Sequence, residues 1–186
     1  MAGFIPRSMQ GGDDSGETRD FVITNSTTIT IGDAVRLASG FIALADQTNR
    51  PLGVVTGIVK RESTNANDPT LPLGTDAIGS VSGTRTGNPG NVGSETYASA
   101  SDNQTVDMVM ARVLVDPSQE YYNDSDGTLT AAMIGTYFDC LAASDQIDQS
   151  STSTTGQFVL MAIDPDNDAD ASKGIFRIAE HALSLG

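Results

Sequence analysis

The residues best suited to chemistry are aspartates near the C-terminus that occupy alternate positions. They are Asp164, Asp166, Asp168 and Asp170. Several carboxylates in a short span can bind Ca²⁺, but a calcium loop also needs a glycine at its sixth position and a glutamate at its twelfth. Counted from the first or the second aspartate, those positions hold Ala169 or Ala171 and then Ile175 or Arg177. We therefore expect a solvated acidic turn, with no metal and no cofactor bound by this chain.

Covalent or acid–base catalysis would need a nucleophile beside a base, and the sequence offers few candidates. His181 is the only histidine. Residues 79–83 have the glycine spacing of a nucleophile elbow, but Val81 stands where the serine would be. Cys140 is the only cysteine, and its aromatic and aliphatic neighbours predict a buried, unreactive thiol. The sequence therefore predicts that the chain is not an enzyme.

Length and charge limit the classes of partner. The chain has 186 residues, enough for one well-buried domain, and its 10 Lys plus Arg against 24 Asp plus Glu give a net charge of −14. Such a charge repels nucleic-acid phosphates and anionic membranes. No apolar run is long enough to span a bilayer, and the N-terminus lacks the basic and apolar regions of a signal peptide. We expect a protein made in the cytoplasm that binds neither nucleic acid nor membrane.

The elements that would position any site are predicted to be short β-strands separated by turn residues. The chain has 19 glycines and only 5% aromatic residues, and short apolar segments alternate with polar loops. The predicted strands cover residues 21–23, 27–31, 34–37, 41–45, 54–59, 77–81, 105–115, 137–141, 157–163 and 174–181. Residues 128–134 fit one or two helical turns that stop at Gly135. The predicted fold is mostly β, a barrel or a sandwich with at most one short helix.

The clearest strand pattern lies at residues 105–115. Val109, Ala111, Val113 and Val115 share one face, and Val106, Met108 and Met110 share the other. Apolar side chains on both faces predict a central strand that is covered on both sides. They also suggest surface that one domain with a thin aliphatic core does not cover alone, so we expect a homo-oligomer, and a trimer in particular.

Residues 1–20 are predicted to form an extended N-terminal arm, and residues 21–186 a single β domain with long surface loops. The arm begins with a small apolar group and continues through glycines and aspartates that have little to bury. An extended apolar segment can add to the exposed edge of a partner's sheet. We therefore expect this arm to be without fixed structure until it binds. The predicted partner-binding residues are Phe4, Ile5, Pro6, Arg7, Met9 and Phe21.

A pattern in residues 32–55 resembles small bacteriophage head decoration proteins. It consists of Gly32-Asp33-Ala34-Val35-Arg36-Leu37, then Gly40-Phe41-Ile42-Ala43-Leu44-Ala45-Asp46, then Arg50-Pro51-Leu52-Gly53-Val54-Val55. Residues 133–139 and 157–164 are similar to the second half of larger phage head-stabilising proteins. The resemblance implies that the first pattern folds as a β-hairpin running into a barrel strand, in a β-tulip or barrel-like domain. This chain is longer than the smallest members of the family.

The resemblance also implies a function. Members of that family sit on the outside of an icosahedral capsid as oligomers, often trimers, and clamp neighbouring capsomers without any catalytic residues. It implies that this chain is a homotrimeric cement protein of the virion whose partner is the major capsid protein. The alternative is a receptor-binding or glycan-binding protein of a phage head or tail, which would need aromatic and polar groups in a concave site. Four tyrosines and no tryptophan give little sign of such a site.

Overall fold

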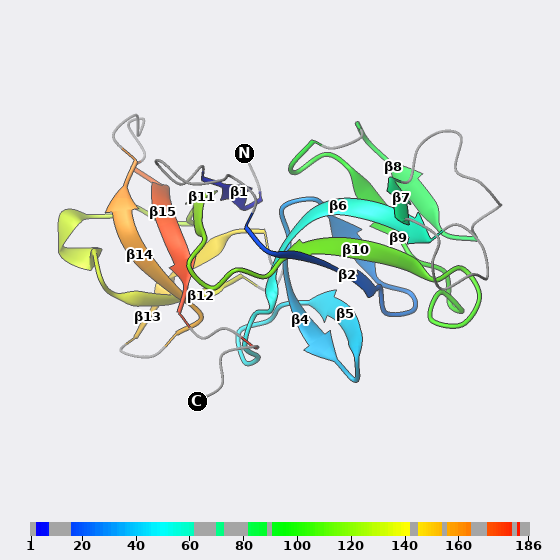
Figure 1. Ribbon diagram of the computed structural model, residues 1–186. Helices are drawn as coiled ribbons and strands as arrows, with labels where there is room; N and C mark the ends of the chain where they lie inside the picture. The colour runs from blue at the N-terminus through cyan, green and yellow to red at the C-terminus, as the bar shows by residue number, and fades with distance from the viewer. Residues whose placement is uncertain are drawn as a thin grey trace.

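The fold is mostly β and consists of three antiparallel sheets (Figure 1). It is seen in a computed structural model that describes residues 3–7, 16–61, 70–72, 82–88, 91–141, 145–153, 156–164, 171–179 and 182. Over these residues no sheet closes into a barrel, so the sandwich is the predicted alternative that fits. The described chain has one helix, the single 3-10 turn η1 (Ala131–Met133), and Gly135 follows it at φ +84°. The prediction of at most one short helix is confirmed for this part of the chain.

The larger sheet of the N-terminal half has the strand order β2-β10-β6-β4-β5, with β7 paired to β6. Its strands are β2 (Thr18–Val22), β4 (Ala34–Ala38), β5 (Phe41–Leu44), β6 (Gly53–Arg61), β7 (Thr70–Pro72) and β10 (Val109–Leu114). The two ends of this order approach each other, because one bridge joins Ile23 to Ile42 and the Thr24 N–H donates to the Ile42 carbonyl at 2.8 Å. A single bridge leaves the sheet open.

A smaller sheet packs with the larger one around the N-terminal core. It has the order β3-β9-β8 and consists of β3 (Thr28–Thr30), β9 (Thr96–Ala98) and β8 (Thr84–Thr86). Ile29 and Tyr97 from this sheet are fully buried in the same apolar cluster as Val109 and Val113 of β10. The N-terminal core therefore lies between two sheets, as in a sandwich.

Strand β10 is central, as its apolar pattern predicted, but it is shorter than the prediction. It pairs with β2 on one side and β6 on the other. On the face away from the N-terminal core, Met110 and Leu114 are only 8% and 5% exposed. Val106 and Met108 are the exception, because they lie in the turns before the strand and are 64% and 47% exposed. Their alternation extended the predicted strand too far.

The C-terminal half forms a six-stranded sheet with the order β1-β11-β15-β14-β12-β13. Its strands are β1 (Ile5–Pro6), β11 (Glu120–Asp124), β12 (Tyr137–Cys140), β13 (Ile147–Ser153), β14 (Phe158–Ile163) and β15 (Lys173–Ile178). The pairing of β14 with β15 confirms the predicted closing strand pair. The first strand of the chain thus completes the sheet made by the last five (Figure 1).

A second apolar core joins the two halves of the molecule. Phe138, Phe158 and Phe176 of the C-terminal sheet are fully buried in it. Ala34 and Val54, which belong to the N-terminal sheet, are buried in the same cluster. Because residues from both halves contribute to this core, the C-terminal sheet packs directly on strands β4 and β6.

Six strands had no counterpart among the predicted strands, namely β1, β7, β8, β9, β11 and β13, and the strand predicted at residues 77–81 lies outside the described residues. The longest, β13, has the sequence Ile-Asp-Gln-Ser-Ser-Thr-Ser, in which only Ile147 is apolar. It forms the edge of the C-terminal sheet opposite to β1, where side chains need not be buried. Two of its backbone N–H groups are bound by carboxylates, since Gln149 donates to Asp126 Oδ1 at 2.7 Å and Ser150 to Asp148 Oδ1 at 3.0 Å.

Candidate functional site

Residues 3–7 lie against the C-terminal sheet of their own chain, which corrects the expectation of an arm without structure. Phe4 is fully buried, with its ring stacked on Phe158 at 4.8 Å between centroids and edge-on to Tyr121 at 6.0 Å. The Phe4 N–H donates to the carbonyl of Gly32 at 2.8 Å. Phe4 is therefore a core residue, and its aromatic surface is not available to a partner.

Three other predicted partner-binding residues remain partly accessible. Ile5 and Pro6 form β1, pair with Tyr122 and Tyr121, and are half-buried. Arg7 Nη1 lies 2.8 Å from the carboxylate of Glu120, and the guanidinium carbon lies 5.9 Å from the centroid of the Tyr122 ring. The accessible part of the predicted site therefore lies at the edge of the C-terminal sheet that β1 forms.

The remaining two predicted residues are not part of this edge as the structure describes it. Phe21 lies on β2, is half-buried and packs against the N-terminal core, in a different sheet. Met9 lies outside the described residues. Thr18 begins β2, and Asp20 is tied to Arg112 of the neighbouring strand by two bonds of 2.9 and 3.0 Å. The end of the predicted arm is thus part of the N-terminal sheet.

A hollow of about 420 Å³ lies beside β1. Its lining comes from the N-terminal segment, β11, β15 and the residue after β14: Gly3, Ile5, Tyr122, Asn123, Asp124, Asp164, Lys173 and Gly174. Ile5 and Tyr122 supply apolar wall, and the hollow also holds two carboxylates and one ammonium group. This combination suits a protein side chain with an apolar stem and a polar end. We call this surface, together with Pro6 and Arg7, the β1 edge.

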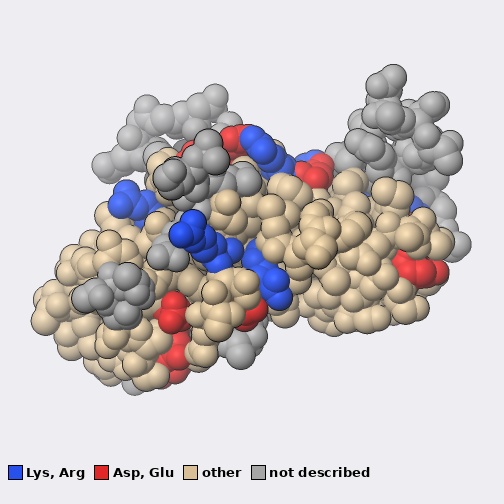
Figure 2. Space-filling model, turned by 90° about the horizontal axis from the view of Figure 1, so that it is seen from below, with Lys and Arg blue, Asp and Glu red and all other residues tan. Residues whose placement is uncertain are grey.

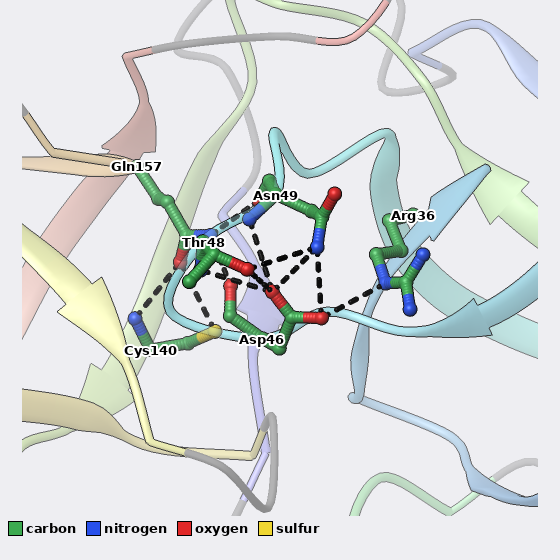
Figure 3. Close-up of polar contacts among 6 residues, drawn as sticks. All are labelled: Arg36, Asp46, Thr48, Asn49, Cys140 and Gln157. Atoms are coloured by element: carbon green, nitrogen blue, oxygen red, sulfur yellow. Dashed lines mark hydrogen bonds and ion pairs between the residues drawn. The ribbon is translucent and has the colours of Figure 1, made fainter. Parts of the chain in front are cut away.

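The second polar arrangement is the turn between β5 and β6, which carries the Leu-Ala-Asp and Arg-Pro-Leu-Gly residues of the sequence pattern (Figure 3). The Asp46 carboxylate accepts hydrogen bonds from the backbone and side chains of Thr48 and Asn49 at 2.7 to 3.0 Å. Arg36 Nε lies 3.2 Å from Asp46 Oδ2. Burial alone would raise the pKa of Asp46, but the bonds from Asn49 and Thr48 and the charge of Arg36 outweigh it and lower the pKa to about 2. The turn is thereby held in one shape.

Gln157 joins this turn to the C-terminal sheet. Its side chain is 4% exposed, and its Nε2 donates to the backbone carbonyls of Asp46 and Asn49 (Figure 3). Its Oε1 accepts from the backbone N–H and the Sγ of Cys140, both at 3.1 Å. Burial raises the pKa of the Cys140 thiol to about 12. The prediction of a buried thiol is confirmed, and the cluster is a structural joint.

Neither a known protein family, nor a curated protein, nor a solved structure matches this chain. The roles of these residues therefore have to be argued from the chain's own geometry.

The structure describes only some of the residues that the sequence suggested for metal binding or catalysis. Asp164 lines the hollow of the β1 edge, whereas Asp166, Asp168, Asp170 and His181 lie outside the described residues. Among the residues that the structure describes, no three His, Cys, Asp or Glu side chains are placed to share a metal ion. In the same part of the chain, no helix has the length and apolar character to cross a membrane.

Several arginines form ion pairs with neighbouring acids. Arg7 pairs with Glu120, Arg85 Nε lies 2.7 Å from Glu95, and Arg112 Nε lies 2.9 Å from Asp20. Figure 2 shows that, on one face, several Lys and Arg side chains gather near the middle of the molecule, with Asp and Glu close by. The negative net charge is therefore not spread evenly over the surface.

Asp33, which belongs to the sequence pattern of residues 32–55, is a buried acid. It is 5% exposed and accepts a hydrogen bond from the Thr30 N–H at 2.7 Å. It lines a small cavity of about 130 Å³ together with Asp145 and Gly3. Burial, with a smaller contribution from the charge of Asp145, raises the pKa of Asp33 to about 7.

We expect Asp33→Asn to stabilise the protein clearly more at pH 8 than at pH 5. Below about pH 7 the folded protein keeps the Asp33 proton. The unfolded chain loses this proton near pH 4, so the contribution of Asp33 to stability falls as the pH rises from about 4 to 7. Asparagine keeps an acceptor for Thr30 and removes the charge, so the variant should gain about 2 to 4 kcal/mol at pH 8. Urea unfolding at both pH values measures this gain. An equal difference at both values would contradict it.

Proposed function

We propose that this chain is a structural protein that decorates a bacteriophage capsid, binding the outside of the assembled shell and stabilising contacts between capsomers. Its partner is the major capsid protein, and its working form is a homo-oligomer, with a trimer favoured. The attachment surface is the β1 edge, where Ile5, Pro6 and Arg7 lie beside the hollow of about 420 Å³. The accessible remainder of the predicted partner-binding residues thus lies beside a recess that can receive a side chain of the partner.

One observation supports the proposal: the decoration-like sequence pattern forms a β-hairpin, as the resemblance implies, although in the described part of the chain the strand that follows belongs to an open sheet and not to a barrel. Residues 34–38 and 41–44 form the β4–β5 hairpin, with Ala38 paired to Phe41. Ser39 and Gly40, at φ 53° and 87°, make its two-residue turn, whose positive φ values match the twist of a hairpin. The chain then continues through the Asp46 turn into β6, which pairs with β4 at Ala34 and Val54.

The arrangement of the two halves also suits this role. The Gln157 joint and the shared core make one rigid body from two groups of sheets. A cement protein adds buried interface across a boundary between subunits. This role requires a stiff body with more than one contact region, and it does not require catalytic residues.

The test is sedimentation of the purified protein with undecorated, expanded heads of the phage that encodes this chain. We expect saturable binding in a fixed ratio to the capsid protein and a higher melting temperature of the decorated heads. An Arg7→Glu variant, which places a like charge beside Glu120 at the β1 edge, should bind more weakly. Unaltered head stability and no binding of the wild-type protein would rule the proposal out. Binding of the same protein to host glycans would favour the receptor-binding alternative.

A further inference from the structure

Residues 104–108, which we call the apex loop, present two apolar side chains to solvent. Val106 is 64% exposed and Met108 is 47% exposed. The loop precedes β10 at the end of the molecule away from the C-terminal sheet, so it lies far from the β1 edge (Figure 1). Single exposed apolar residues are common on proteins, but two in one short loop call for a closer look at what holds them.

A fully buried asparagine, Asn103, holds the backbone of the apex loop in place. The Asn103 Nδ2 donates to the carbonyls of Ile23 and Val109 at 2.7 and 3.1 Å, and the Val109 N–H donates to Asn103 Oδ1 at 3.1 Å. The Met108 N–H donates to the Asn103 carbonyl at 2.7 Å. A buried polar side chain with its bonds made holds the backbone around it in one conformation. The position of Met108 is therefore set by the core.

A buried carboxylate and a strained backbone complete the loop. Asp107 is 5% exposed and accepts hydrogen bonds from the N–H groups of Ser82 and Gly83 at 2.8 and 3.3 Å. Met108 has φ +48°, and the other non-glycine residues with positive φ in the described chain are serines and an alanine. The left-handed conformation costs a long side chain about 1 kcal/mol or more, which asparagine or glycine would avoid. The chain thus keeps a strained methionine, held rigidly, where its side chain is exposed.

We propose that the apex loop is a second attachment point, in which Val106 and Met108 insert into an apolar socket on a capsid protein subunit other than the one bound by the β1 edge. This inference rests on the proposed function and deepens it. A loop already held in its binding conformation loses little entropy on docking, so two apolar side chains can contribute strongly to affinity. Contacts at opposite ends of one rigid body would connect two capsomers, which is how a cement protein stabilises a shell.

The charge of the chain favours this partner over an anionic membrane. At a net charge of −14, an anionic lipid surface would be repelled, whereas a second copy of the chain is distinguished by the test below. A protein surface with an apolar socket and a neutral or basic rim would not be repelled. Because the two side chains protrude, their partner has to be concave.

The test compares variants for binding to undecorated heads and for thermal stability. In Val106→Ser/Met108→Asn, serine removes apolar surface and asparagine tolerates the left-handed backbone. We expect a melting temperature at or above the wild-type value and about 30-fold weaker binding to heads. The single variant Met108→Asn should shift both quantities in the same directions, and Met108→Leu should bind like the wild type. Ile134→Asn is the matched control, since Ile134 is 48% exposed but lies in the C-terminal half, and it should bind normally.

Each outcome decides the inference. If the wild type binds heads and the double variant binds equally well, the apex loop is not an attachment point and the proposed function stands. If the wild type does not bind heads, the proposed function fails and the inference fails with it. A variant that binds heads normally but changes the oligomeric state in light scattering, or loses binding to lipid vesicles, would assign the loop to a second copy or to a membrane and overturn the inference.

Discussion

Replacing Phe4 with alanine is expected to lower the free energy of unfolding by about 3 to 5 kcal/mol, the range for truncating a fully buried phenylalanine. The ring stacks on Phe158 and meets Tyr121 edge-on, so its removal leaves a cavity between two aromatic residues of the second core. For a chain of this length the loss corresponds to a fall in melting temperature of roughly 6 to 20 °C. Thermal and urea unfolding of the purified variant measure both quantities.

Leu37→Ala is the control for this experiment. Leu37 is 38% exposed, so truncating it to alanine should cost well under about 1.5 kcal/mol, the lower limit for a leucine side chain that is fully buried. Deletion of residues 1–7 should destabilise the protein at least as much as Phe4→Ala, because it also removes the pairing of β1 with β11. A truncated protein with an unchanged melting curve would show that this segment leaves the sheet in solution.

Replacing Gln157 with leucine is expected to cost about 2 to 4 kcal/mol, although leucine has a similar volume and is apolar. The change leaves the part-buried carbonyls of Asp46 and Asn49 and the buried N–H of Cys140 without their partner. Each buried polar group left without a bond costs about 1 to 3 kcal/mol, and part of this is recovered where water enters. Urea unfolding of the variant measures the loss.

Two further variants separate the hydrogen bonds of Gln157 from its packing. Gln157→Glu keeps the shape but turns the donor toward two carbonyls into an oxygen, so it should be at least as destabilising as leucine. Gln47→Leu changes the same residue type within the turn that Gln157 binds, where the exposed side chain makes one bond of 3.0 Å to Asp148. It should stay within about 0.5 kcal/mol of the wild type. Equal losses for positions 47 and 157 would contradict the role of Gln157 as the joint.

The strands that the sequence predicted well are those with apolar residues on a buried face. Residues 34–37, 41–45 and 54–59 correspond to β4, β5 and β6, because valine, isoleucine and leucine both favour extended chain and fill the core. Strand β13 was missed because an edge strand with one buried end needs no such pattern. Local composition therefore predicted strands rich in apolar residues, whether interior like β6 or at an edge like β5, and missed strands that are mostly polar, such as β13.

The site residues depended on contacts between distant parts of the chain, which composition does not reveal. A single phenylalanine followed by glycines and aspartates is typical of a free arm, yet Phe4 fits a space formed by residues more than 100 positions away. Gln157 and Asp33 are polar residues in a polar sequence, and only their burial distinguishes them. By contrast, the spacing of Asp46, Thr48 and Asn49 is typical of a turn closed by an aspartate, and it offered a signal that was not used.

The carboxylate bonds along β13 affect how the protein behaves when many copies are crowded together. Free N–H groups on an outer strand invite a strand of another molecule, and this is a common start of aggregation. Asp126 and Asp148 already occupy the N–H groups of Gln149 and Ser150, so an incoming strand would have to displace a carboxylate at each. Concentrated preparations should therefore stay free of cross-β fibrils.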